Sequence, residues 1–281
     1  MALEDFKEAL GLLRTLPVLW IPGVVAGLLT ACLWIVLDTS GTFFASRLVI
    51  LFALVVLVFV TGMLAVIKKG EGNIRTLMTE GVRYYFRVLL PLVVVVFVVT
   101  MIILVIMMAA TLAIGGTPDM SILSVISLCI LIPAFLLTLF TDTVAVFEDC
   151  RVFASIKRSV TLASSHAGEV IRFFIVCAAT CFVVIFGLMI VWEAALYTKL
   201  EPLTAYNETQ MAAFTPEQFM TLVGHDGIWV TAVISFVGVL ILLPVLMTYK
   251  TCFFKKIAGS VPVIIQQQAG EYDSKGRWYK Y

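Results

Sequence analysis

Long stretches of this chain are apolar and carry almost no charge, and they alternate with short stretches in which charged residues gather. A helix needs roughly 20 mostly apolar residues to cross a bilayer. Of the 281 residues, 62% are hydrophobic and 13% are charged, which is more apolar surface than one water-soluble core can bury. The sequence therefore predicts an all-α integral membrane protein with six transmembrane helices. We expect the spans at residues 16–37, 47–67, 88–114, 122–147, 170–197 and 228–254.

The distribution of Lys and Arg between these spans predicts the orientation of the chain. The N-terminus, the loops after spans two and four, and the C-terminal end hold 17 of the 19 Lys and Arg residues. The opposite side holds only Arg47 and Lys199. The positive-inside rule then places both termini in the cytoplasm. We expect the membrane to be the plasma membrane. Residues 1–260 form a single transmembrane domain in this interpretation, and residues 261–281 form a cytoplasmic tail.

Three cytoplasmic segments, near residues 3–14, 74–87 and 152–163, have apolar residues at helical spacing and charged residues elsewhere. Such amphipathic helices lie in the membrane interface, where their basic residues approach anionic headgroups. Asp149 is expected to cap the third helix. In the second helix we expect these residues to share the apolar face: Ile74, Leu77, Met78, Val82 and Tyr85.

These segments suggest an internal repeat in which one amphipathic helix precedes a hairpin of two spans. Three units would begin near residues 3, 73 and 151. The ends of spans two and four, residues 61–67 and 141–147, are identical at three of seven positions, and a weaker match begins at Thr248. Because apolar segments align easily by chance, three similar hairpins without common ancestry remain an equal alternative.

Asp142 is the sharpest candidate for a functional residue, because it lies inside span four with Thr138 roughly on its helical face. Ionisable residues at such depth often mark ion or substrate paths. The alternative is a structural role, in which Asp142 pairs with a cation such as Arg75, Lys157 or Arg158, or with nearby hydroxyl and backbone donors.

Two further features concern packing and modification. Gly23, Gly27 and Ala31 form a stripe of small residues in span one, which is typical of close helix packing. Their partner can be a helix of the same chain or of another subunit. Asn207 begins an Asn-x-Thr glycosylation signal in the longest outer link, residues 198–227. Later in that link, Thr215 is expected to cap a short helix that ends at Gly224.

The sequence contains no spacing typical of a catalytic, cofactor or metal site. The six cysteines include no C-x-x-C pair, and the two histidines are far apart. A metal site built from Glu217, His225 and Asp226 is the one conceivable arrangement. A net charge of +1 gives no reason to expect a nucleic-acid partner. We therefore expect a protein that is not an enzyme and has no cofactor, with membrane lipids and either further copies of itself or another membrane protein as partners.

The segment after span four resembles part of a known family. Residues 146–149 (Val-Phe-Glu-Asp), then Ala154, residues 156–159 (Ile-Lys-Arg-Ser) and Leu162 resemble a motif of the membrane domain attached to some glycerophosphoryl diester phosphodiesterases. The opening residues 6–10 fit the same pattern. The resemblance implies a prokaryotic multi-pass membrane module. It implies no activity, because no soluble segment of this sequence is large enough to be the catalytic domain.

Two functions follow from these patterns. The first is a non-catalytic scaffold or lipid-associated module. The second is a transporter or channel for a small solute or lipid, with Asp142 in its path. Polar residues other than Asp142 are mainly scattered Ser and Thr rather than a continuous stripe, which favours the first.

The predicted orientation can be measured by thiol labelling in sealed vesicles. A membrane-impermeant maleimide should modify Cys150 in inverted vesicles and leave it unmodified in right-side-out vesicles, because the loop that holds it is cytoplasmic. An Asn207→Cys variant serves as the opposite control and should gain label only in right-side-out vesicles. Labelling of Cys150 from the outside would contradict the orientation.

Overall fold

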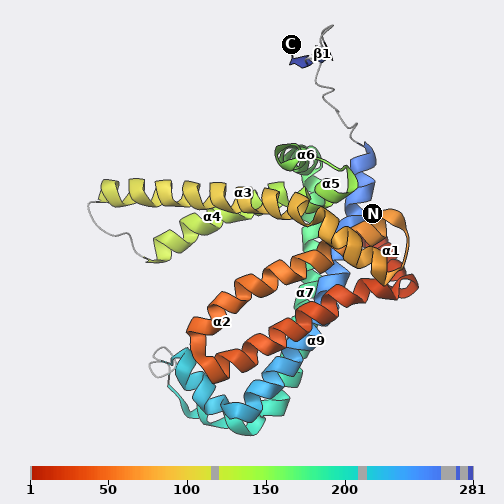
Figure 1. Ribbon diagram of the computed structural model, residues 1–281. Coiled ribbons are helices and arrows are strands. Elements are labelled where there is room, and N and C mark those ends of the chain that lie inside the picture. The colour runs from red at the N-terminus through yellow and green to blue at the C-terminus, as the bar shows by residue number, and fades with distance from the viewer. Residues whose placement is uncertain (1, 115–119, 208–213, 261–269, 273–277, 281) are drawn as a thin grey trace.

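The computed structural model describes residues 2–114, 120–207, 214–260, 270–272 and 278–280, and nearly all of them are helical (Figure 1). Five helical segments within these ranges are long and apolar enough to cross a membrane: Pro17–Lys69, Ile74–Leu112, Leu123–Phe147, Ala167–Leu203 and Gln218–Gly259. This confirms the expectation of an all-helical chain whose helices suit a membrane. The elements in chain order are α1 (Ala2–Thr15), η1 (Pro17–Trp20), α2 (Ile21–Lys69), α3 (Ile74–Ile114), α4 (Met120–Thr138), α5 (Thr141–Phe147), α6 (Val152–Ser165), α7 (Ala167–Leu200), η2 (Glu201–Ala205), α9 (Pro216–Ser260), β1 (Gly270–Tyr272) and β2 (Trp278–Lys280).

Helix α2 contains both of the first two predicted spans. Its 49 residues would extend about 74 Å if straight, more than twice the apolar thickness of a bilayer. Figure 1 shows instead that α2 turns back on itself, and Ile21 and Met63 pack against one apolar cluster. The turn is at Gly41, whose φ of 76° suits glycine and few other residues. The expected nine-residue link 38–46 was therefore wrong, because a single glycine makes the turn between two helical arms.

The next two spans also have different limits from those expected. Helix α3 joins the amphipathic segment and span three into one helix of 41 residues, with no boundary at residue 88. Span four is divided into α4 and α5 by a break at Leu139 and Phe140. In Figure 1 the α3 and α4 helices extend away from the group formed by α2, α7 and α9.

The amphipathic start of α3 packs on protein through a stripe that shares only Leu77 with the apolar face predicted to lie in the membrane interface. Leu77, Tyr84 and Val88 are buried, while Ile74 and Val82 are 58% and 63% exposed. The buried stripe follows the spacing i, i+7, i+11 and packs on the end of α2. The face with Ile74 and Val82 is apolar but uncovered, so this segment has a protein-facing stripe and a separate exposed apolar stripe.

Most buried side chains gather at one end of the molecule. Residues 61–67 of α2, most of 140–146, and 248–254 of α9 are buried, and they supply the centres of three apolar clusters. These segments correspond to the ends of the three predicted hairpins, which were aligned with one another in the sequence. The remaining lengths of α3 and α4 are mostly exposed, so this hairpin is held to the rest of the protein chiefly at this end. Helices α2, α7 and α9 also pack together at the opposite end, around Leu196, Val223 and Ile228.

Two glycines of the predicted small-residue stripe lie against α9. A Cβ atom on Gly23 would lie 2.6 Å from the Leu240 carbonyl oxygen, and one on Gly27 would lie 2.8 Å from the Phe236 carbonyl oxygen. Pro244 has no N–H to donate to Leu240, so the carbonyl that Gly23 approaches lacks its usual helical donor. The partner of this stripe is thus a helix of the same chain, whereas Ala31 is only half-buried.

A second close contact joins the end of α2 to the start of α3. A Cβ atom on Gly62 would lie 2.1 Å from the Leu77 carbonyl oxygen, and one on Gly81 would lie 2.4 Å from the Val58 carbonyl oxygen. The Thr61 hydroxyl donates to the Gly81 carbonyl oxygen at 2.9 Å. The two backbones therefore meet directly at this crossing, and only glycine leaves room for them.

The tail, predicted as cytoplasmic residues 261–281, lies partly outside the described residues. Its described part consists of β1 and β2, which pair antiparallel with Glu271 opposite Tyr279. Neither of these two short strands was predicted.

The crossing of α2 and α3 can be tested with one methyl group. Gly62→Ala should lower the free energy of unfolding by about 1–3 kcal/mol, because the new Cβ meets backbone that cannot move aside. Gly187→Ala in α7 is the matched control, since nothing lies within 4 Å of its Cβ position. It should be neutral or stabilise the helix by up to about 1 kcal/mol. Equal thermal stability of the two variants in detergent would show that the crossing is not close-packed.

Candidate functional site

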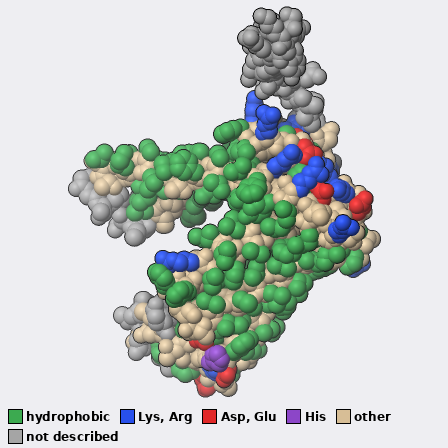
Figure 2. Space-filling model, in the orientation of Figure 1, with side chains coloured by type: hydrophobic (Ala, Val, Ile, Leu, Met, Phe, Trp, Pro, Cys, Tyr) green, Lys and Arg blue, Asp and Glu red, His purple; other side chains and the backbone are tan. Residues whose placement is uncertain are grey.

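Charged side chains concentrate at the end of the molecule where the buried core lies. Figure 2 shows Lys, Arg, Asp and Glu gathered around α1, α6 and the end of α9, while hydrophobic side chains cover the long helices. We call this region the charged end and define it as α1, residues 60–88, residues 141–165 and residues 248–260. It is the candidate functional site, because the described residues bring most ion pairs together here.

Each of three helix crossings at the charged end contains an ion pair. Lys69 at the end of α2 contacts Glu80 of α3 at 2.9 Å. Arg158 of α6 contacts Glu148, just after α5, at 3.2 Å. Lys256 of α9 contacts Asp5 of α1 at 2.9 Å, which joins the two ends of the helical chain. The end of each hairpin is thus tied to one short amphipathic segment.

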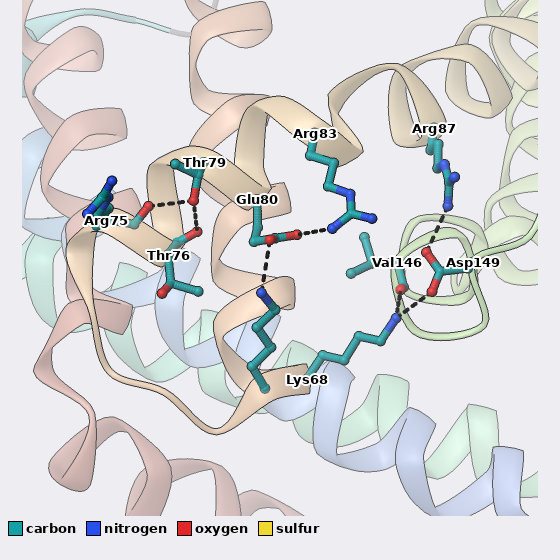
Figure 3. A network of polar contacts seen from close by, with 10 residues as sticks. Lys68, Arg75, Thr76, Thr79, Glu80, Arg83, Arg87, Val146 and Asp149 are labelled. Atoms are coloured by element: carbon teal, nitrogen blue, oxygen red, sulfur yellow. Dashed lines mark hydrogen bonds and ion pairs between the residues drawn. The ribbon is translucent and has the colours of Figure 1, made fainter.

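Asp149 joins two helices that are far away in the sequence. Its carboxylate accepts from Lys68 Nζ at 2.8 Å and from Arg87 Nη1 at 2.7 Å, as Figure 3 shows. Lys68 also donates to the Val146 carbonyl oxygen at 2.8 Å. The expectation that Asp149 caps α6 was therefore wrong, because the residue before that helix is Arg151 and no side chain caps it.

The backbone and the electrostatics at Asp149 suit this bridging role. Its φ of 51° lies in the left-handed region, which Asp tolerates better than most residues. Burial opposes ionisation of the carboxylate, but the hydrogen bond from Lys68 and the charges of Lys68 and Arg87 outweigh it. The pKa of Asp149 is therefore held below its ordinary value, and the group stays charged at neutral pH.

The residues that carry the family resemblance hold this part of the fold together. Glu148 and Arg158 are both largely buried and pair with each other. Ser159 donates to the Leu137 carbonyl oxygen at 2.9 Å and accepts from the Phe140 backbone N–H at 3.1 Å. It therefore replaces helical hydrogen bonds at the break between α4 and α5. The motif positions therefore have structural contacts here.

Asp142 is paired with a cation from α9. Lys250 Nζ lies 2.5 Å from one carboxylate oxygen, and the other accepts from the Thr143 backbone N–H at 2.7 Å. The Asp142 and Lys250 side chains are 20% and 9% exposed. The partner is not Arg75, Lys157 or Arg158, the three cations named from the sequence. Lys250 is the one cation inside span six, and matching lone charges between spans could have identified it.

Other polar side chains near this pair make different contacts. The Thr138 hydroxyl donates to the Ala134 carbonyl oxygen of its own helix at 2.7 Å, so it does not join Asp142 through that bond. Three buried hydroxyls next to the pair in sequence lack a hydrogen-bond partner among the described residues. They belong to Thr141, Thr248 and Tyr249. Buried hydroxyls usually have partners, so these three groups could bind water.

The opposite end of the molecule carries fewer charges. His225 Nδ1 lies 2.8 Å from Asp38, and Trp229 donates to the other ring nitrogen of His225 at 3.1 Å. Thr215 and Gln218 exchange two hydrogen bonds, which is the expected capping box. The left-handed Gly224 then interrupts the helix, although α9 continues beyond it to Ser260.

Among the described residues, no contact supports the predicted metal site or the predicted glycosylation site. Within the described part of the chain, no group of three His, Cys, Asp or Glu residues could hold a metal ion. The Glu217 side chain of the conceivable site lies outside the described atoms. Asn207 is exposed, and the next two residues of its glycosylation signal lie outside the described residues.

An apolar groove of about 650 Å³ runs between α4 and α7. Phe135 and Phe174 meet across it with ring centroids 5.8 Å apart. A groove without polar groups cannot conduct ions or orient a polar substrate, but it matches a hydrocarbon chain. Its lining consists of Leu131, Ile132, Phe135, Leu136, Ile171, Phe174, Ile175 and Ala178.

Comparisons of this chain with protein-family models, with curated proteins and with solved structures find no match.

The buried pair at the second crossing can be tested by removing one charge. Glu148→Gln should lower the free energy of unfolding by on the order of 3 kcal/mol, because it removes the counter-charge that Glu148 supplies to the largely buried Arg158. Asp226→Asn is the control at the other end, where the carboxylate is 91% exposed and 3.8 Å from Lys199. The control should be close to neutral. A small loss in Glu148→Gln, measured by thermal unfolding in detergent, would contradict the structural role.

Proposed function

We propose that this chain is a non-catalytic membrane protein with six spans that serves as a scaffold or lipid-associated module. The observation that carries the proposal is the pairing of Asp142 with Lys250. An acid inside a span needs a counter-charge, a proton or water, and here it has a counter-charge and a backbone donor. Asp142, the residue that gave most support to a transport function, therefore has a structural explanation.

The two arms of α2 support six crossings rather than five. Residues 21–40 and 42–69 are each about 30 Å long or more, so either arm can cross the apolar core alone. The charged end then faces the cytoplasm, as the distribution of Lys and Arg predicts. In that orientation the ion pairs at the three crossings lie near the cytoplasmic headgroups.

The three crossings also support descent from a repeated unit. In each, the end of a hairpin crosses a short amphipathic segment, and the third hairpin crosses the segment that begins the chain. The order of contact is therefore cyclic. We include the prokaryotic family of multi-pass modules in the proposal, because the residues of the shared motif stabilise the second crossing.

One observation favours the alternative function, a transporter or channel. The unpartnered hydroxyls of Thr141, Thr248 and Tyr249 lie beside the residues of the Asp142–Lys250 pair in sequence. Water bound to these hydroxyls would add polar groups among the buried residues of α5 and α9, and polar groups inside spans are a feature of ion pathways.

Flux measurements separate the two functions. In proteoliposomes loaded with a pH-sensitive dye, the wild-type chain should show no proton flux above empty vesicles, and Asp142→Asn should show none either. Asp142→Asn should also lower stability, because it leaves Lys250 buried without a counter-charge. Combining it with Lys250→Met should restore part of the loss. Wild-type flux that disappears in the folded double variant would refute the scaffold proposal.

A further inference from the structure

The surface formed by the ends of α2 and α3 carries more positive than negative charge. Figure 3 shows Lys68, Arg83 and Arg87 near two carboxylates, Glu80 and Asp149. A fourth cation, Lys69, pairs with Glu80 at 2.9 Å. The ion pairs among these residues therefore leave two positive charges unbalanced. The excess lies toward solvent, because the Arg83 and Arg87 side chains are 69% and 49% exposed.

The two arginines retain donors for another ligand. Arg87 reaches Asp149 through Nη1, and Arg83 lies 3.6 Å from Glu80, also through Nη1. A guanidinium has five N–H donors, so most of the donors remain outside these contacts. Arg83 and Arg87 are one helical turn apart on α3, which places their side chains on neighbouring positions of one face.

An exposed apolar stripe continues from the arginines along α3. Phe86, Leu90, Val93 and Phe97 are between 47% and 65% exposed, and they follow helical spacing from Arg83. We call Arg83, Phe86, Arg87, Leu90, Val93 and Phe97 the arginine-headed stripe. It has a positive end and an apolar length, so its pattern matches a phospholipid with an anionic headgroup.

The same charges disfavour a second copy of the chain as the occupant. Copies in one membrane share an orientation, so a symmetric pair has its axis along the membrane normal. If the stripe lay at that axis, Arg83 and Arg87 of the two copies would face each other. Their like charges would repel, whereas an anionic headgroup would neutralise them.

We propose that Arg83 and Arg87 bind the phosphate of an anionic phospholipid, whose acyl chain lies along Leu90, Val93 and Phe97. This inference rests on the proposed lipid-associated function and gives it a site and a lipid class. A zwitterionic lipid has a phosphate too, but its own cation offsets the attraction of the two unbalanced charges. The site therefore distinguishes phosphatidylglycerol from phosphatidylcholine.

Native mass spectrometry of the full chain in detergent tests the site, with each of these two lipids titrated separately. The wild-type chain should retain phosphatidylglycerol more tightly than phosphatidylcholine. Arg83→Gln should weaken phosphatidylglycerol binding about fivefold, the ratio expected for one basic residue at an anionic surface, and Arg83→Gln with Arg87→Gln should weaken it further. Arg151→Gln with Lys157→Gln removes two exposed cations elsewhere at the charged end and should have little effect.

Three results would overturn the site: equal retention of the two lipids, equal losses in the test and control double variants, or removal of the preference by inorganic phosphate alone. If loss of the Asp149 contact prevents the double variant from folding, the Arg83→Gln variant decides, since Glu80 keeps its pair with Lys69. The lipid-binding result can be distinguished from the result of the flux experiment that tests the proposed function. Proton flux through Asp142 would refute the scaffold without affecting lipid preference, and absent lipid preference would refute the site without producing flux.

Discussion

The ion pairs at the charged end are the interactions on which the rest of this architecture depends. Long apolar helices gain little from contact with one another in lipid, because lipid chains are as apolar as their side chains. Charged groups are different, since each must be neutralised or hydrated where it leaves the apolar layer. Lys69, Glu148 and Lys256 each find a partner on a short amphipathic segment, and these pairs fix which segment crosses the end of which hairpin.

Close backbone contacts fix the relative positions of the helices more precisely than ion pairs do. At the α2–α3 crossing, Gly62 and Gly81 let two helices touch through their backbones, and Thr61 bonds directly to the Gly81 carbonyl oxygen. Between α2 and α9, Gly23 and Gly27 do the same along a longer contact. The α3–α4 pair has no glycine contact with α7 or α9 among the described residues. Consistent with this, it extends away from them in Figure 1.

The sequence predicted the position of apolar helices well, because their hydrophobicity is a local property of about 20 residues. It failed where one residue decided the geometry, as at Gly41, which turns a helix where a loop was expected. It also failed where a partner was distant in the chain. Asp149 was assigned to the nearby α6, yet its partners Lys68 and Arg87 lie 81 and 62 positions away. Asp142 was matched with three cations, none of which was Lys250, 108 positions away.

These features together bear on the proposed role of lipid. The hairpin of α3 and α4 is fixed chiefly at one end, and much of the surface of α3, α4 and α7 is exposed. In a bilayer those surfaces are solvated by acyl chains, so their exposure carries no penalty there. The groove between α4 and α7 and the arginine-headed stripe on α3 are two places where that lipid would meet a shaped surface. Only the stripe combines an apolar length with unbalanced charge, and that combination makes it selective for the headgroup as well as for the chain.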